Sequence, residues 1–212
     1  MLSEHIIFST AIAILIGMVF FRFTGRDHSW IIILCAWAPD LDVIANRILE
    51  KFGFTLLFEG TAIFHGAFHT LAGLVVFSIL MAFVLHPFGI RFFDSLVFSS
   101  IGFGAHLFED ALVYKTGYMY LWPLVPKRLG IGILPDILSE EYYFRNFFGI
   151  GNTEVLVIGL VLLLGAIIIR TRVEGQEWLR WYMPGWMYTR IFGKHLSVPK
   201  QQVYPEVREQ GR

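Results

Sequence analysis

The sequence predicts an all-α integral membrane protein, a bundle of about five transmembrane helices. Of its 212 residues, 56% are hydrophobic and 16% are charged, and the mean hydropathy is +0.61. A soluble domain usually carries about 25% charged residues and about 45–50% apolar ones. The apolar excess is gathered into runs that approach the ~20 residues a helix needs to cross a bilayer. Together, the composition and the clustering exclude an ordinary soluble domain.

Each predicted helix ends at a polar or helix-breaking signal. The first is followed by Arg22 and Arg26, the third stops at Pro87, and the fifth, which is the most apolar, stops at Arg170. The second is the weakest, because Pro39 and two aspartates lie near its end. No Lys or Arg lies within the apolar part of any of them. The predicted ranges are 6–23, 28–45, 69–87, 92–114 and 151–169.

The remaining segments are predicted to lie at the membrane surfaces. Residues 115–150 are rich in Gly, Pro and aromatic residues, which predicts a partly folded cap with a short helix near 136–148. We expect residues 1–170 to form the transmembrane domain and 171–212 to form an interfacial, partly disordered tail. The stretch "EWLRWYMPGWMYTRIFGKHL" at 177–196 combines Trp and Tyr with basic residues, a mixture suited to the headgroup zone.

Charge predicts the orientation of the chain. Residues 1–169 hold nine Lys/Arg against thirteen Asp/Glu, a balance of −4, whereas residues 170–212 hold eight against four, a balance of +4. The positive-inside rule therefore predicts a multi-pass protein of the cell membrane whose C-terminal tail lies in the cytoplasm. In a membrane protein this asymmetry concerns topology, so the bilayer is the expected partner and no nucleic acid is expected.

Alternation of the spans predicts that seven polar side chains meet at one face of the bilayer. They come from four separate segments: the start of the first helix, the end of the second, the entry to the third and the last turns of the fourth. All seven are residue types that bind metal ions. They are His5, Asp40, Asp42, His65, His69, His106 and Asp110.

Two of these pairs have the spacing of helical metal ligands. His65/His69 and His106/Asp110 are separated by four residues, so each pair shares a helix face if its segment is helical. Imidazole and carboxylate ligands suit Zn²⁺, with Mn²⁺ or Fe²⁺ as alternatives, and the absence of thiolates disfavours a closed structural zinc site. Seven ligands exceed the demand of one ion, which predicts two or three ions with bridging carboxylates. Such a centre activates water and stabilises a displacement at a phosphoester.

The "APDLD" segment at 38–42 is predicted to bend near the membrane surface. Pro39 removes a backbone donor and favours a turn, so the bend can aim both Asp40 and Asp42 inward. A carboxylate left in hydrocarbon costs about 2.5–3.5 kcal/mol even on lenient scales, and a metal cluster would compensate that cost. One of these two carboxylates, Asp40 or Asp42, can instead serve as the general base that takes a proton from metal-bound water, and we favour Asp42.

Simpler interpretations stay open for each group. The two spaced pairs could make only structural hydrogen bonds, Asp40 and Asp42 could only end a helix, and His5 could only be an interfacial polar group. Glu109 precedes Asp110 but points about 100° away on a helix, which favours a supporting or surface role. Nothing in the spacing brings Glu59 to the site. We interpret the other histidines as interfacial polar groups; they are His28, His86 and His195.

Residues 1–125 resemble the YdjM-like membrane proteins, described as predicted membrane-bound metal-dependent hydrolases. The likeness consists of His5, "APDLD" in place of a Leu-Pro-Asp-Ile-Asp type stretch, "HGAFHT", and "GFGAHLFEDALV" followed by "YLWP". In the family the third stretch often reads His-Arg-Gly-x-Thr-His-Ser. Gly66 and His69 match that pattern, whereas Phe64 and His65 stand where the first His and the Arg would be, and Val43 stands where a His commonly follows the second Asp.

The resemblance implies a membrane-bound metal-dependent hydrolase. The family is in turn thought to be distantly similar to zinc-dependent phospholipase C, an all-helical enzyme with His-x-x-x-Asp and His-x-x-x-Glu pairs, and His106/Asp110 fits the first pattern. We therefore expect hydrolysis of a phosphoester, which could be lipid-linked, by metal-activated water. The alternative is a metal-ion carrier, sensor or metal-binding membrane protein without catalysis.

Overall fold

A computed structural model of the protein describes residues 2–55, 57–58, 61–62, 66–133 and 153–193. The described regular structure is helical apart from a two-stranded antiparallel hairpin, β1 (Leu57–Phe58) and β2 (Thr61–Ala62). The chain divides into two compact units, Met1–Gly175 and Gln176–Arg212, near the boundary expected at residue 170. The all-α membrane fold predicted from the sequence is confirmed.

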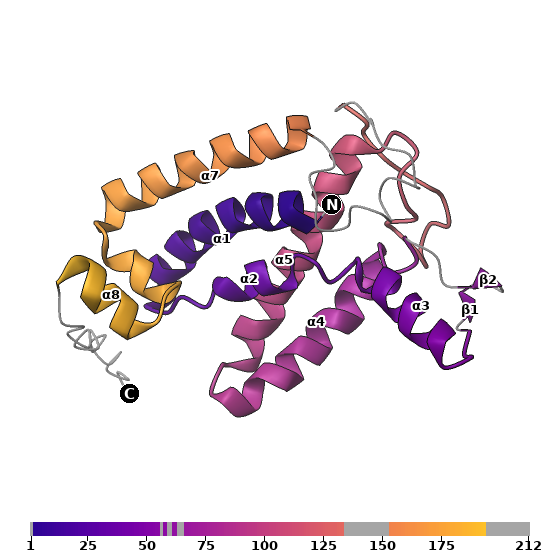
Figure 1. Ribbon diagram of the computed structural model, residues 1–212, viewed down its shortest axis with the longest axis horizontal. Helices are drawn as coiled ribbons and strands as arrows, with labels where there is room; N and C mark the ends of the chain where they lie inside the picture. The colour runs from indigo at the N-terminus through magenta and orange to yellow at the C-terminus, as the bar shows by residue number, and fades with distance from the viewer. Residues whose placement is uncertain (1, 56, 59–60, 63–65, 134–152, 194–212) are drawn as a thin grey trace, which may run out of the picture. The chain divides into compact units, whose positions relative to one another are not determined.

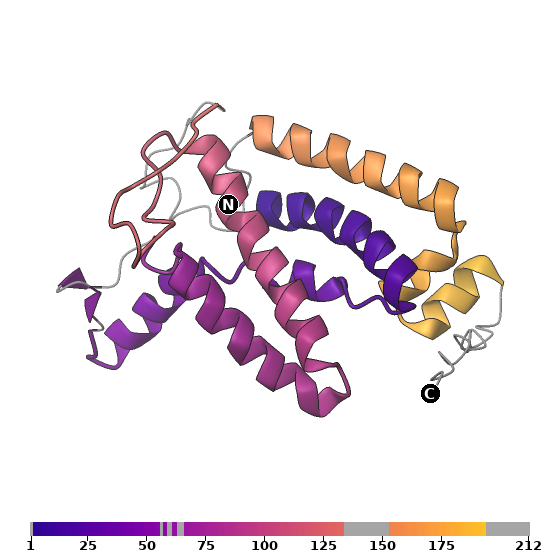
Figure 2. The same ribbon diagram turned by 180° about the vertical axis from the view of Figure 1, so that it is seen from behind.

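Four described helices are long and apolar enough to cross a membrane (Figure 1). They are α1 (Leu2–Thr24), α4 (Leu71–Leu85) with its 3-10 extension η1 (His86–Phe88), α5 (Phe92–Val113) and α7 (Thr153–Glu174). Within the first unit, α1 packs against α2, α5 and α7, while α5 also packs against α2 and α4. The view from behind in Figure 2 shows the same neighbours, with α7 along α1 and α4 paired with α5.

The second predicted span, 28–45, is not one crossing helix. It consists of α2 (Trp30–Cys35), a turn, and α3 (Leu41–Lys51). Pro39 lies in the turn, and the backbone N–H of Asp40 bonds to the Trp37 carbonyl, three residues back, instead of continuing an α-helical ladder. One face of α2, with Ile31, Ile32 and Cys35, is buried inside the bundle, where Gly102 of α5 allows close approach to the Ile32 backbone. Hydropathy alone cannot distinguish such a broken crossing from one continuous helix.

Two ion pairs join the helices at the end where α1 finishes and α5 begins. Arg170 of α7 bonds through Nη2 to Asp27 Oδ2 at 2.6 Å, and both side chains are fully buried. Arg26 bonds through Nε to Asp94 Oδ2 at 2.9 Å. Because α7 continues to Glu174, Arg170 lies inside the apolar helix instead of ending it, contrary to the sequence-based expectation.

The cap is described as far as residue 133, and its predicted helix near 136–148 lies outside the described residues. A β-bridge joins Tyr118 to Leu129. The carbonyls of Tyr120 and Trp122 accept hydrogen bonds from the backbone N–H groups of Leu71 and Ala72 at the start of α4. The cap is thereby fixed to the end of α4 where the histidine-containing loop enters.

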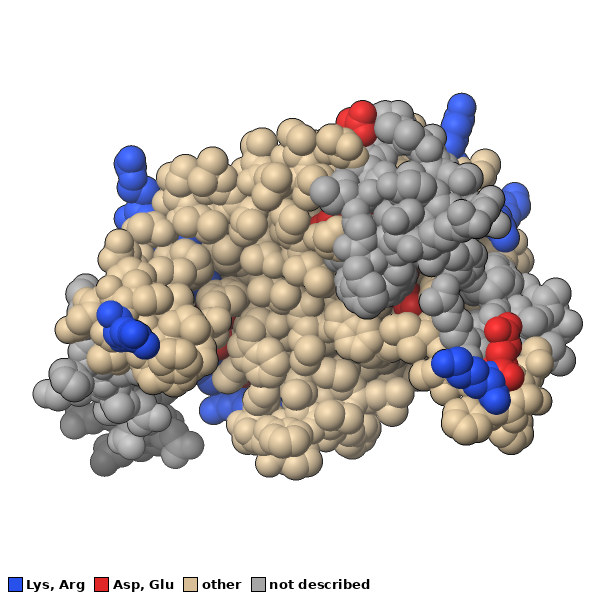
Figure 3. Space-filling view, viewed as in Figure 1, with Lys and Arg blue, Asp and Glu red and all other residues tan. Residues whose placement is uncertain are grey.

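The second unit contains η2 (Glu177–Trp181) and α8 (Gly185–Phe192). Trp186 and Ile191 of α8 are exposed, and the Arg180 guanidinium lies over the Trp181 ring at 4.9 Å from its centroid. This mixture of exposed aromatic and basic groups is compatible with the predicted interfacial tail. On the face drawn in Figure 3, a broad area carries few Lys, Arg, Asp or Glu side chains, as a lipid-facing surface requires.

Candidate metal centre

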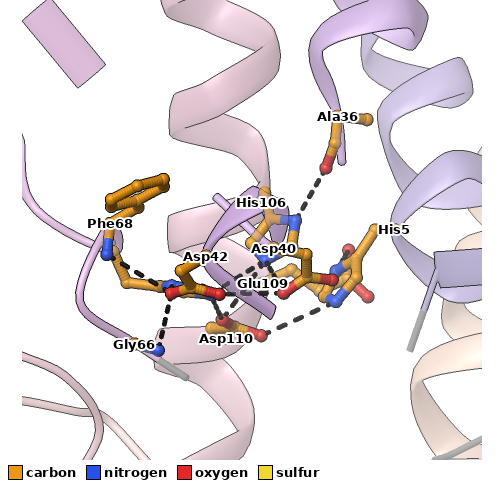
Figure 4. Close-up of polar contacts among 10 residues, drawn as sticks. His5, Ala36, Asp40, Asp42, Gly66, Phe68, His106, Glu109 and Asp110 are labelled. Atoms are coloured by element: carbon orange, nitrogen blue, oxygen red, sulfur yellow. Dashed lines mark hydrogen bonds and ion pairs between the residues drawn. The ribbon is translucent and has the colours of Figure 1, made fainter. Parts of the chain in front are cut away.

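Four separate segments of the first unit deliver seven polar side chains to one buried cluster (Figure 4). His5 comes from the start of α1, and His69 lies two residues before α4. The others are Asp40 at the N-cap of α3, Asp42 in its first turn, and His106, Glu109 and Asp110 of α5. Of the seven predicted ligands, six are brought together, and His65 lies outside the described residues. Alternation of the helices produces this convergence, as expected.

Four donor atoms lie close together around the facing Nε2 atoms of His69 and His106. His69 Nε2 lies 3.2 Å from His106 Nε2 and 3.2 Å from Asp110 Oδ2. His106 Nε2 lies 3.5 Å from Asp110 Oδ2, and Asp40 Oδ1 lies 3.6 Å from both imidazole nitrogens. A tetrahedral ion with metal–ligand bonds of ~2.0–2.1 Å requires ligand–ligand distances of ~3.3 Å. The donors of His69, His106 and Asp110 lie near that distance from one another, so these three side chains can hold one cation together.

A polar group faces the other ring nitrogen of each imidazole. His106 Nδ1 lies 2.7 Å from the Ala36 carbonyl oxygen, which can only accept, so Nδ1 carries the proton and Nε2 keeps its lone pair. His69 Nδ1 lies 3.5 Å from Asp42 Oδ2, which places a carboxylate behind this imidazole. A carboxylate or carbonyl behind the imidazole is the usual support of a metal-binding histidine.

Asp42 lies behind His69 and supports the loop that carries it. Its Oδ2 accepts hydrogen bonds from the backbone N–H of Gly66 at 2.8 Å and of Phe68 at 3.3 Å. Gly66 has φ +102°, and a Cβ at this position would overlap the Tyr118 ring of the cap. Since Oδ2 faces Nδ1 of His69, whereas Nε2 of His69 faces His106 and Asp110, the geometry favours a positioning role for Asp42 over the predicted role of general base.

His5 forms a second arm of the cluster. Its Nε2 lies 3.9 Å from Asp110 Oδ1, the oxygen that does not face His69, and its ring stacks on His106 with centroids 3.7 Å apart. His5 Nδ1 lies 3.2 Å from Glu109 Oε2. His5, Asp40 and His106 each offer a ligand atom within 4.8 Å of the others. Asp110 can therefore bridge two positions, with one oxygen toward each.

Glu109 belongs to this site, although its direction on the helix favoured a supporting or surface role. It does point away from the His69 side of Asp110, but α1 packs on that side and brings His5 to it. The sequence contains a usable signal: "LFEDALV" places two acidic residues side by side in an apolar helix, where an unpaired carboxylate is costly. Only the packing of α1 identifies the partner.

The electrostatics of the cluster favour bound positive charge. Asp40, Asp42, His69 and His106 are almost completely inaccessible, and Asp110 is nearly so. Burial by itself disfavours a protonated imidazole, but contacts with Asp110 and Asp42 outweigh burial and raise the pKa of His69 to about 10. Three buried aspartates thus create a local potential that stabilises a cation, as a divalent metal site requires.

The four spans among the described residues and this buried His/Asp cluster define the class: a multi-pass membrane protein with a candidate metal site at the ends of its helices. A family model described as YdjM inner membrane protein matches residues 1–192. The chain therefore belongs to the YdjM inner membrane protein family, and the match extends beyond the resemblance over residues 1–125. Neither the curated proteins nor the solved structures gave a match.

Proposed function

We propose that the protein is a membrane-bound, metal-dependent hydrolase of phosphoesters. The observation that carries the proposal is the close approach of donor atoms from His69, His106, Asp40 and Asp110, with five of their donor–donor distances between 3.2 and 3.6 Å. A mixed nitrogen and oxygen donor set of this kind suits Zn²⁺ first, with Mn²⁺ or Fe²⁺ as alternatives.

The second arm supports two ions over one. His5 Nε2 and Asp110 Oδ1 would hold the second ion, while Asp110 Oδ2 serves the first. Such bridging carboxylates are typical of centres that act on phosphoesters. When bound, a pair of divalent ions supplies Lewis-acid polarisation of a phosphoryl oxygen and lowers the pKa of water from ~15.7 toward ~7.

The side chains of the chain have distinct tasks in this proposal. Ala36 fixes the tautomer of His106 and Asp42 lies behind His69, so both Nε2 atoms point at the same centre. Glu109 orients His5 in the same manner. The tightly packed surroundings exclude bulk water, which strengthens every charge interaction in the cluster.

The depth of the site indicates the substrate class. His69 precedes the span that begins at Leu71, and Asp110 lies within the last turn of the span that ends at Val113. The cluster is therefore at the boundary of the hydrocarbon, the level at which lipid phosphates lie. A phosphoester carried by a lipid headgroup would meet the site without leaving the membrane.

Purification in lipid nanodiscs, followed by elemental analysis and assays with phosphodiesters and phospholipids, tests the proposal. His69→Ala and Asp110→Ala are expected to lose bound metal and hydrolysis together. His86→Ala is the matched control, because His86 is exposed and lies beyond the far end of α4. Retention of both metal and hydrolysis in the two cluster variants would contradict the assignment.

One observation favours a second candidate, a metal-ion carrier, sensor or metal-binding protein without catalysis. The cluster is almost wholly buried, and a site that only stores or senses an ion needs no room for a substrate. Location at the helix ends argues against transport, because carriers commonly bind their ions near the midplane. Metal binding without hydrolysis of any substrate would favour this candidate, and uptake into liposomes would then separate a carrier from a sensor.

The proposed orientation puts the C-terminal tail in the cytoplasm and the cluster on the opposite side. Arg26 and Arg91 support this topology by the positive-inside rule, whereas Arg170 contributes less than its position suggests because Asp27 pairs it inside the bundle. A protease-cleavable tag at the C-terminus tests the topology. Cleavage of the tag by a protease added outside intact cells would show the opposite orientation.

A further inference from the structure

α3 has an apolar face that no other described element covers. The helix leaves the metal centre at Asp40 and Asp42, and no described helix or strand packs along it. Ile44 is 38% exposed, Ile48 50% and Phe52, just beyond the helix, 73%. Because these residues follow one another at intervals of four, they lie within ~80° of each other on the helix surface. They form one continuous stripe, which we call the α3 stripe.

The rest of α3 makes it amphipathic. Glu50 is exposed and points ~200° away from Ile48, whereas Lys51 is exposed ~60° from Ile48, at the edge of the stripe. Asp42 and Val43, on the side away from the stripe, are buried against the bundle. A short helix with an apolar stripe, a lysine at the edge of that stripe and no described helix packed along it has the character of a helix that lies in a membrane interface.

The position of α3 matches this character. The helix begins at a cluster that lies where α4 starts and α5 ends, at the boundary of the membrane-spanning region. Leu71 and Val75 in the first turns of α4 are also exposed, and they belong to a membrane-spanning helix at the same level. The α3 stripe therefore begins near the end of the bundle at which these exposed apolar side chains also begin. Phe54, 64% exposed, adds a further apolar group beyond the end of α3.

We infer that α3 is an interfacial helix whose Ile44, Ile48 and Phe52 side chains are seated in the outer part of the bilayer, with lipid acyl chains as their partner. Glu50 then faces water, and Lys51, at the edge of the stripe, faces the headgroups. Since Asp40 and Asp42 form the start of this helix, the lipid contact fixes the depth at which the two carboxylates are presented. The inference concerns a surface and stands independently of any hydrolytic activity.

Single labelled cysteines distinguish lipid from water and from protein at this surface. Ile48→Cys and Glu50→Cys are labelled with an environment-sensitive fluorophore and reconstituted into phosphatidylcholine liposomes containing phosphatidylglycerol. Cys35, the only native cysteine, is fully buried, and labelling of the unmodified protein measures its background. Both variants must keep the elution profile and the metal content of the parent, which confirms that they are folded.

The label at Ile48 is expected to lose most of its fluorescence with lipids carrying a nitroxide near the top of the acyl chain, and little with aqueous iodide. The label at Glu50 is expected to behave in the opposite way. Quenching of both labels by iodide alone would overturn the inference, because α3 would then lie in water. Quenching of the Ile48 label by neither agent would also overturn it, since a second copy or another protein would then cover the stripe.

Discussion

Replacement of Asp42 by Asn tests whether this carboxylate supports His69 or binds the metal itself. In the structure, Asp42 Oδ2 accepts two backbone N–H groups, those of Gly66 and Phe68, and faces His69 Nδ1 at 3.5 Å. An Asn carbonyl can take the place of Oδ2 and keep all three contacts. What the substitution removes is the negative charge that makes the His69 imidazole a stronger ligand.

The expected effect is therefore graded. Loss of a supporting carboxylate typically weakens metal affinity by about 10–100-fold. We expect Asp42→Asn to lie near the lower limit, ~1.4 kcal/mol, because its hydrogen bonds survive. Asp42→Ala should lie near the upper limit, ~2.8 kcal/mol, because the loop from Gly66 to Phe68 then also loses its acceptor. His69→Ala, which deletes one of four donors, should reduce affinity much further.

Competition between the protein and a fluorescent zinc chelator, in nanodiscs at constant pH, measures these affinities. Asp94→Asn is the matched control: it also neutralises a buried aspartate, but one that pairs with Arg26 at the opposite end of the bundle. It should lower thermal stability and leave affinity unchanged. The reasoning is refuted if Asp42→Asn abolishes binding as completely as His69→Ala, which would make Asp42 a ligand, or if it has no effect.

Three further predictions follow from other contacts. Gly66→Ala should destabilise the protein by about 1–3 kcal/mol and weaken metal binding, because φ at Gly66 is +102° and the Tyr118 ring of the cap blocks the added methyl group. Gly89→Ala is the control: φ at Gly89 is +82° and the space around it is open, so this variant should lower stability without changing metal binding. Arg170→Leu should cost about 3–5 kcal/mol in thermal unfolding, since it leaves Asp27 buried without its guanidinium, and adding Asp27→Leu should recover part of the loss. In chelator-treated protein, the contribution of His69 to the free energy of unfolding should be fully present below pH 6.5 and disappear as pH rises through about 10, because the pKa of His69 is raised in the folded state. His69→Gln should flatten that part of the plot of melting temperature against pH. An unchanged plot would contradict the assignment.

The site could be predicted from the sequence to the extent that it depends on helix alternation. His5, His69, His106 and Asp110 each lie near the end of a strongly apolar run, so counting crossings assigns them to the same face. The same argument holds for Asp40 although its helix is broken, because α2 and the following turn still reach that face. Whether these residues bind metal is a chemical question that alternation does not answer.

Contacts that depend on lateral packing could not be predicted in this way. Pairing of Arg170 with Asp27 requires α7 to lie beside α1, and hydropathy does not say which spans are neighbours. For Glu109 the missing information was likewise the identity of the helix on its far side. Position along a helix is encoded locally, whereas the partner of a helix face is a property of the assembled bundle.

The interruption after α2 has a consequence for proton placement in α5. In an uninterrupted helix the Ala36 carbonyl would accept a hydrogen bond from the N–H of Asp40. Here the Asp40 N–H donates to the Trp37 carbonyl instead. The Ala36 oxygen accepts from the imidazole of His106, 70 residues further along the chain. The turn that contains Pro39 therefore makes the Ala36 carbonyl available as the acceptor for the Nδ1 proton of His106. If this turn became a regular helix, the Ala36 carbonyl would no longer hold the proton on Nδ1 of His106. The proton could then move to Nε2, which would no longer offer a lone pair toward His69 and Asp110.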